Sequence, residues 1–183
     1  MIKRALVSVV LPIVVAFGLC YIQSPRAGAY LRYHLGLYDL KKEEKLLRKT
    51  IKQFNIDYAT VFNTGGTTYV LDEYPAANLV KRRTYQEANI WAAQGLVLVY
   101  DRDKTIIEGI RFYGPFRAVV VAKELWFINF QDIKTRKYLS PLKADRIRVR
   151  YLMKKVPGKG WIVQDYEVYS DKEKVNTEVD KQW

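Results

Sequence analysis

The sequence predicts an α+β fold in which helices pack on one curved antiparallel sheet of about five strands, behind a single N-terminal membrane-spanning helix. An apolar run without charged residues occupies residues 5–25, and helical periodicity follows over residues 41–94. Strand-like alternation fills most of the chain from Gly95 onward. Only short turns separate the expected strands, which favours antiparallel pairing because parallel strands need long crossovers.

The apolar run is long enough to cross a bilayer. A helix rises ~1.5 Å per residue, so about 20 apolar residues span the hydrocarbon core. Residues 5–22 approach that length, and Lys3 and Arg4 precede them. We therefore expect a retained single-pass anchor, with an interfacial tyrosine near its end. The anchor residues are expected to include Leu6, Val10, Val14, Phe17 and Tyr21.

A cleaved secretory signal is the competing interpretation of the same run. Ala27-Gly28-Ala29 offers small residues at the spacing that a signal peptidase needs. The run is longer than the ~7–15 residues of a usual signal core, which favours retention. Lipid attachment at Cys20 is not expected, because the large Leu19 precedes it.

The direction of the anchor stays open. Lys and Arg are more numerous after the run than before it, which by itself predicts a cytoplasmic domain. A short N-terminal tail followed directly by an apolar run is instead typical of an uncleaved export signal. We expect a cell inner-membrane protein with a periplasmic or exoplasmic domain; a mitochondrial inner membrane or a cytoplasmic-facing domain is the alternative.

The composition is that of a globular domain with excess positive charge. The chain has 183 residues, 49% of them hydrophobic, and a formal net charge of +12. Anionic lipid or an acidic partner suits this charge, whereas no nucleic-acid motif is present and nucleic acid is not expected as a partner. One cysteine and one histidine exclude a disulfide scaffold, a Cys-based metal site and most Ser-His chemistry. No cofactor and no metal are expected.

Two helices are expected before the sheet. In residues 41–64 apolar side chains recur with the spacing of one helical face, and Gly65-Gly66 ends the pattern. A second helix is expected over residues 77–94. Residues 30–40 are expected to form a helical extension of the anchor or an interfacial segment. The inward stripe of the first helix comprises Leu47, Ile51, Phe54, Tyr58, Val61 and Phe62.

The strands are bounded by turn residues. Residues 101–104 (Asp-Arg-Asp-Lys), 114–115 and 157–160 are expected as turns, and 133–143 as a loop. The strands are expected at 96–100, 105–113, 116–130, 144–156 and 161–169. The chain is expected to divide into an anchor or signal (1–25), a juxtamembrane linker or helix (26–45), the α+β domain (46–170) and a charged tail (171–183).

Residues 46–169 resemble the NTF2-like (cystatin-like) α+β superfamily. The resemblance rests on residues 51–62 as first helix, 117–121 as a central strand and 160–168 as final strand. With the anchor, the chain resembles VirB8-type inner-membrane components of secretion and conjugation machines. It departs from them at the turn 157–160, where they carry Asn-Pro-x-Gly. Anchored Mce-associated proteins and mitochondrial Tim44-like domains fit about as well.

The superfamily resemblance implies a cone between helices and sheet, in which enzymes place an Asp base with Tyr or Asp donors. Nothing in the sequence brings two such groups together, and acid–base chemistry requires a partner within hydrogen-bond reach. We therefore expect no catalytic residues. The candidates for the cone are Asp57, Tyr58, Asp72, Tyr100, Glu108, Tyr113, Asp165 and Tyr166.

Basic residues on one strand suggest a docking surface. Arg146, Arg148 and Arg150 alternate along residues 144–156, so their guanidinium groups share one face, suited to carboxylates or phosphates. A solvated sheet face is the simpler interpretation of the same pattern. If the face docks a partner, the basic triplet Lys81, Arg82 and Arg83 is expected to extend it.

Two functions remain open at this level. The first is a non-catalytic, membrane-anchored assembly subunit of a membrane or envelope complex, with other subunits as partners and a homo-oligomer as an option. The second is a small-ligand-binding protein or enzyme that uses the cone, which rests on fold analogy. A cone packed shut by Phe54, Tyr58, Trp91 and Trp126 would favour the first function, and an open cone lined by Asp and Tyr the second.

Overall fold

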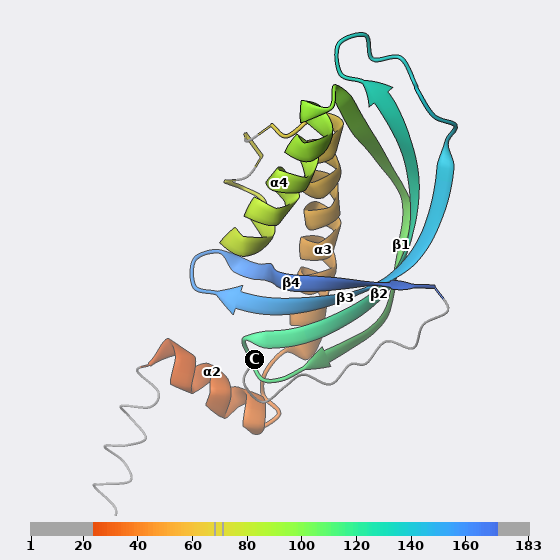
Figure 1. Ribbon diagram of the computed structural model, residues 1–183. Coiled ribbons are helices and arrows are strands. Elements are labelled where there is room, and N and C mark those ends of the chain that lie inside the picture. Colours follow the sequence, from red (N-terminus) through yellow and green to blue (C-terminus); the bar gives the residue numbers. More distant parts are fainter. Residues whose placement is uncertain (1–23, 68, 71, 172–183) are drawn as a thin grey trace, which may run out of the picture. The chain divides into compact units, whose positions relative to one another are not determined.

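The computed structural model describes residues 24–171 apart from 68 and 71. Within these residues the chain falls into two compact units, one ending at Leu40 and the other beginning at Lys41. Helices precede strands, as predicted (Figure 1). The elements are α2 (Pro25–His34), α3 (Leu40–Asn63), α4 (Asn78–Ala93), β1 (Leu96–Phe112), β2 (Arg117–Asp132), β3 (Lys143–Val156) and β4 (Gly160–Ser170).

The first unit contains α2. Its N-terminus is capped by Ser24, whose Oγ accepts a hydrogen bond from the Ala27 amide at 3.4 Å, and Pro25 occupies the start of the helix. No helix between residues 24 and 171 is long and apolar enough to cross a bilayer. The expected anchor residues lie outside the described part of the chain, namely Leu6, Val10, Val14, Phe17 and Tyr21.

The second unit is organised around α3, which confirms the predicted helix and its inward face. Leu47, Ile51 and Phe54 are buried in one core cluster with the small residues Ala118 and Ala122 of β2. Small side chains at the centre of the sheet let the large helical side chains pack closely against it. Each large apolar side chain contributes roughly 1.5–3 kcal/mol when fully buried.

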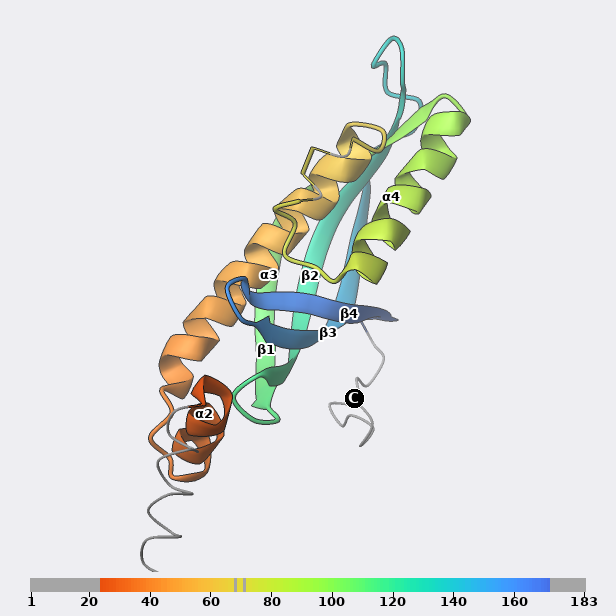
Figure 2. The same ribbon diagram turned by 90° about the vertical axis from the view of Figure 1, so that its left-hand side faces the viewer.

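The sheet has four antiparallel strands in the order β1-β2-β3-β4. In the centre of the sheet Val120 pairs with Ile110 of β1 and with Tyr151 of β3. The strands curve strongly, and α3 and α4 lie on the concave side (Figures 1 and 2). Helices that cover one face of a curved antiparallel sheet form the α+β architecture that the sequence predicted.

The predicted turn at residues 101–104 is wrong. These residues belong to β1, where Asp101 pairs with Phe127 and Arg102 with Trp126, so the two strands expected there form one strand and the sheet has four. The register is irregular between Arg102 and Lys104. β1 is an edge strand, where charged side chains are favoured because they discourage pairing with another chain. The charged run therefore reflects an edge rather than a turn.

Candidate functional site

A cavity of about 180 Å³ lies between α3 and the concave face of the sheet. Phe54, Tyr58 and Trp126 line it without filling it. Trp91 packs instead on Phe130, with ring centroids 5.1 Å apart. The cone is therefore not packed shut, and of the two arrangements set out above the structure has the open one. Its aromatic wall consists of Phe54, Tyr58, Tyr100, Trp126, Tyr151 and Tyr166.

The rings of this wall meet mainly edge to face, the geometry that aromatic quadrupoles favour. The Tyr58 centroid lies 5.6 Å from that of Tyr100, 6.2 Å from that of Trp126 and 6.3 Å from that of Tyr166. Tyr100 and Trp126 are 5.6 Å apart and nearly perpendicular, at 86°. Such pairs contribute about 0.5–1.5 kcal/mol each beyond area burial, so the wall is rigidly positioned.

The tyrosine hydroxyls of the wall stay neutral over the physiological pH range. Burial raises the pKa of Tyr58 and of Tyr151 well above the ordinary tyrosine value, and raises that of Tyr166 as well. Burial also raises the pKa of Tyr100 to about 12. These hydroxyls are therefore neutral hydrogen-bonding groups rather than bases.

Glu124 of β2 provides a buried carboxylate in the cavity wall, with 3% of its surface exposed. Its Oε1 accepts hydrogen bonds from Asn55 Nδ2 and Tyr151 Oη, both at 2.7 Å. Its Oε2 accepts one from Trp126 Nε1 at 2.8 Å. Three donors hold the Glu124 carboxyl group in place.

Glu124 was missed at the sequence level. The local signal was present, because Glu124 alternates with Ala122 and Trp126 on the inward face of a strand whose other inward residues are apolar. The second carboxylate of the lining, Asp145 of β3, is half-buried and was also missed.

Of the predicted candidates, the structure brings Tyr58, Tyr100 and Tyr166 together in the cavity wall. Asp57 does not line the cavity; it is buried elsewhere on α3, where its Oδ1 accepts a hydrogen bond from Gln53 Nε2 at 2.9 Å. The remaining candidates also lie outside the lining, namely Asp72, Glu108, Tyr113 and Asp165. Among the residues that the structure describes, no group of three or more His, Cys, Asp or Glu side chains is arranged to hold a metal ion.

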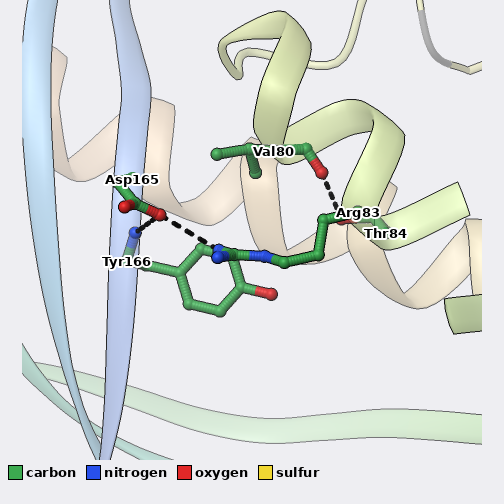
Figure 3. Close-up of polar contacts among 5 residues, drawn as sticks. All are labelled: Val80, Arg83, Thr84, Asp165 and Tyr166. Atoms are coloured by element: carbon green, nitrogen blue, oxygen red, sulfur yellow. Dashed lines mark hydrogen bonds and ion pairs between the residues drawn. The ribbon is translucent and has the colours of Figure 1, made fainter. Parts of the chain in front are cut away.

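Figure 3 shows how α4 holds the wall residue Tyr166. The Arg83 guanidinium lies over its ring, 4.6 Å from the centroid, and Nη2 is 3.1 Å from Oδ1 of Asp165. The same oxygen accepts the Tyr166 amide at 2.9 Å. On α4, Thr84 Oγ1 donates to the Val80 carbonyl at 3.0 Å, so this buried hydroxyl is satisfied within the helix.

The expected arginine row lies on β3 but is largely engaged within the sheet. Arg148 Nε is 3.1 Å from Oε2 of Glu108, and Arg150 Nη1 is 2.9 Å from Oε2 of Glu167. Arg146 is exposed beside the β2–β3 connection. Val149 and Tyr151 alternate with these arginines along β3 and are core residues. The arginine side chains therefore lie on the face of the sheet that is turned away from the helices. Lys81, Arg82 and Arg83 lie on α4, on the helical side, so the structure does not join the two basic sets.

The loop between β2 and β3, residues 133–142, presents a different kind of surface. Tyr138, Leu139 and Leu142 are 66%, 57% and 64% exposed. No acidic residue occurs between 133 and 143. Four exposed basic residues flank the three apolar ones in sequence: Lys134, Arg136, Lys137 and Lys143. No sequence motif indicated this surface, which was expected only as a connecting loop.

No protein-family model matches this chain, and no curated protein matches it in sequence. Among solved structures, it is similar to the intermembrane-space region of the chloroplast protein ARC6, with a TM-score of 0.59 and 16% identity over 69% of this chain and 96% of that one. VirB8 of Agrobacterium tumefaciens matches with a TM-score of 0.38 and 12% identity, covering 73% and 96%. An NTF2-like protein of unknown function from Prochlorococcus marinus matches with a TM-score of 0.33 and 20% identity, covering 50% and 63%. The chain shares the fold of the ARC6 region.

Proposed function

We propose that this chain is a non-catalytic, membrane-anchored assembly subunit that docks onto other subunits of a membrane or envelope complex through its α+β domain. The observation that carries the proposal is the exposed apolar and basic surface of the loop 133–142. Three large apolar side chains on this one connection, Tyr138, Leu139 and Leu142, are mostly exposed to solvent, which supports its use as an interaction site. The anchor comes from the apolar run of residues 5–22.

The loop is held in one conformation by its own hydrogen bonds. Asp132 Oδ1 accepts the amides of Lys134 and Thr135 at 3.0 and 2.6 Å. The Leu139 amide donates to the Phe130 carbonyl at 2.8 Å, and Ser140 Oγ accepts the Phe130 amide at 3.0 Å. A preorganised loop loses little conformational entropy on binding, which favours affinity.

The chemistry of the loop defines its partner. The excess of basic residues in the loop suits a partner surface that carries carboxylates, and Tyr138, Leu139 and Leu142 suit an apolar patch inside that surface. Arg146 follows the loop in sequence and adds a further exposed basic residue to it. We therefore propose an acidic protein subunit with an apolar centre as the occupant. The ARC6 region named above, an intermembrane-space domain with the same fold, supports a domain on the exoplasmic side.

Site-specific photocrosslinking in native membranes tests the proposal. A benzophenone amino acid at position 139 of the full chain is expected to give a light-dependent adduct with one partner protein. The same group at position 79, where Leu79 is 71% exposed on α4, is the matched control and is expected to give none. The double substitution Leu139→Asp and Leu142→Asp is expected to release the partner during purification in mild detergent, and Leu79→Asp to retain it.

The outcomes separate the alternatives. Retention of the partner by the double variant, or equal adducts at positions 79 and 139, would overturn docking through the loop. Adducts with lipid in place of protein, lost when anionic lipids are depleted, would assign the loop to the membrane surface instead. The affected side chains are exposed, so the variants are expected to keep the thermal stability of the parent protein.

A second candidate function is ligand binding in the cone. It is favoured by the open cone, the arrangement named above for ligand binding. It does not exclude docking through the loop, because no residue of 133–142 lines the cavity. The fixed Glu124 carboxylate and neutral tyrosines fit binding better than acid–base catalysis.

A further inference from the structure

The cone cavity differs in charge from the rest of the molecule. The chain has a formal net charge of +12. Among the described residues that line the cavity there is no Lys, Arg or His, whereas Glu124 and Asp145 both line it. The tyrosines add no charge, because burial keeps their hydroxyls protonated. A cavity lined by two acidic side chains and no basic one suits a cation better than an anion.

The Glu124 carboxylate meets only neutral donors. Its hydrogen bonds come from an amide, a phenol and an indole, those of Asn55, Tyr151 and Trp126. Within the part of the chain that the structure describes, no lysine, arginine or histidine forms an ion pair with it. Buried glutamates are seldom found without a positive partner, since desolvating the charge is costly. Two acceptor positions lie on each carboxylate oxygen, so Oε2 has capacity beyond its bond to Trp126.

The aromatic wall offers a second attraction for a cation. The faces of Tyr and Trp rings carry the negative lobes of their quadrupoles and attract ammonium and guanidinium groups within ~6 Å of the centroid. The Tyr166 ring of the wall already attracts a cation in this way, because the Arg83 guanidinium lies 4.6 Å from its centroid. Asp165 balances the charge of Arg83 at 3.1 Å, which limits its repulsion of a second cation in the cavity.

The cavity size limits what can enter. Its volume of about 180 Å³ exceeds the ~150 Å³ of an engineered apolar cavity that accommodates benzene. It is below the ~300–1,000 Å³ of sites for drug-sized ligands. A compact group with few heavy atoms fits these bounds.

We propose that the cone cavity binds a small organic cation of the substituted-ammonium class, held between the Glu124 and Asp145 carboxylates and the faces of Tyr58, Tyr100 and Trp126. This inference rests on the second candidate function and is independent of docking through the loop 133–142. A free amine and the headgroup of a lipid share this chemistry.

A pair of isosteric ligands tests the charge requirement. Choline and its neutral carbon analogue, 3,3-dimethylbutan-1-ol, are titrated into the full chain in a non-ionic detergent and followed by calorimetry. Choline is expected to bind at least about 10-fold more tightly, as a desolvated cation–π contact and a nearby carboxylate predict. Phosphocholine is a third arm: tighter binding than choline assigns a lipid headgroup, and weaker binding assigns a free cation.

Matched variants test the location of the site. Asp145→Asn removes a charge from the lining, and Tyr58→Leu removes an aromatic face; each is expected to weaken choline binding about 3- to 10-fold. Asp72→Asn, an exposed carboxylate outside the cavity, is the control and is expected to leave binding unchanged. Glu124→Gln places an amide opposite the Trp126 donor, so this variant can weaken choline binding by disturbing the cavity wall. A loss of binding in Glu124→Gln therefore supports the proposal only if Asp145→Asn and Tyr58→Leu also weaken binding.

Equal binding of choline and the neutral analogue would overturn the cation class while leaving the cone as a ligand site. Binding of neither ligand would overturn the proposal altogether. Choline binding that both Asp145→Asn and Tyr58→Leu leave unchanged would place the cation outside the cavity and also overturn it. None of these results depends on the crosslinking experiment with the loop.

Discussion

Trp161 of β4 donates a hydrogen bond of 2.7 Å from its indole Nε1 to Oε2 of Glu43, in the first turn of α3. Oε1 of the same carboxylate lies 2.6 Å from Nζ of Lys155 on β3. Glu43 is buried, and its charge also lies at the helix end that favours an anion. A single side chain thus joins the beginning of α3 to the β3–β4 hairpin.

We expect Glu43→Ala to lower the free energy of unfolding by about 2 kcal/mol, because it removes the acceptor of the buried Trp161 indole N–H and the ion pair with Lys155. Denaturant unfolding of the full chain, followed by tryptophan fluorescence, measures the change. Glu44→Ala is the control, since the exposed pair of Glu44 with Arg48 is worth roughly 0.5 kcal/mol or less. Similar losses in the two variants would contradict a joining role for Glu43.

Asp57 is expected to destabilise the fold at neutral pH. Burial raises its pKa above the ordinary value of 3.8, and within the described residues its Oδ2 has no hydrogen-bond partner. The folded state therefore retains a proton that the unfolded state has released, so stability falls as the pH rises from 3.8 through the raised pKa. Asp57→Asn is expected to raise the free energy of unfolding at pH 7 by about 1 kcal/mol, a gain that disappears in acid.

Melting temperatures across a pH series test the sign of the Asp57 effect. Asp132 is the opposite case, because hydrogen bonds from the Thr135 amide and hydroxyl lower its pKa. Asp132→Asn is therefore expected to give no stabilisation at neutral pH. A gain for Asp57→Asn that persists at pH 3 would show that the amide acts through something other than removal of the charge.

Tyr100 is expected to contribute to alkaline unfolding. Burial raises its pKa from 10.0 to about 12, so between these values the unfolded state releases a proton that the folded state keeps. Stability therefore falls with rising pH across this interval. Tyr100→Phe is expected to make the fall shallower, as measured by the free energy of unfolding at several alkaline pH values. Tyr69→Phe, at an exposed site outside the cavity, is expected to leave the slope unchanged.

Gly66 and Gly95 both have positive φ angles, +89° and +77°, but differ in their surroundings. A Cβ on Gly66 would lie 3.0 Å from Asn89 Oδ1, whereas one on Gly95 would meet open space. Gly95→Ala is expected to cost roughly 1 kcal/mol through backbone strain, and Gly66→Ala more, because Asn89 must also move away from its hydrogen bond to the Tyr85 carbonyl. The free energy of unfolding of Gly66→Ala and Gly95→Ala is measured in the parent protein and in Asn89→Ala. The extra cost of Gly66→Ala over Gly95→Ala is expected to disappear in the Asn89→Ala background.

The helices α3 and α4 and the faces of β2 to β4 were predictable because their signals are local. The stripe of Leu47, Ile51 and Phe54 predicts the buried face of α3 from its spacing alone, and period-two alternation does the same for Tyr151 on β3. The expected anchor also rests on local composition, and its residues lie outside the described part of the chain.

Continuity of β1 and the lining of the cone cavity were decided only by the tertiary structure. Residues 101–104 extend the strand because β2 provides partners for their backbone, which local composition does not reveal. Asn55 and Tyr151 meet although they are 96 positions apart, and Glu124 lies 69 positions from Asn55. Sequence by itself determined which residues turn inward. Which of these inward residues form hydrogen bonds with Glu124 depends on packing between distant segments. A buried carboxyl group needs hydrogen-bond partners, and only the tertiary structure brings them within reach.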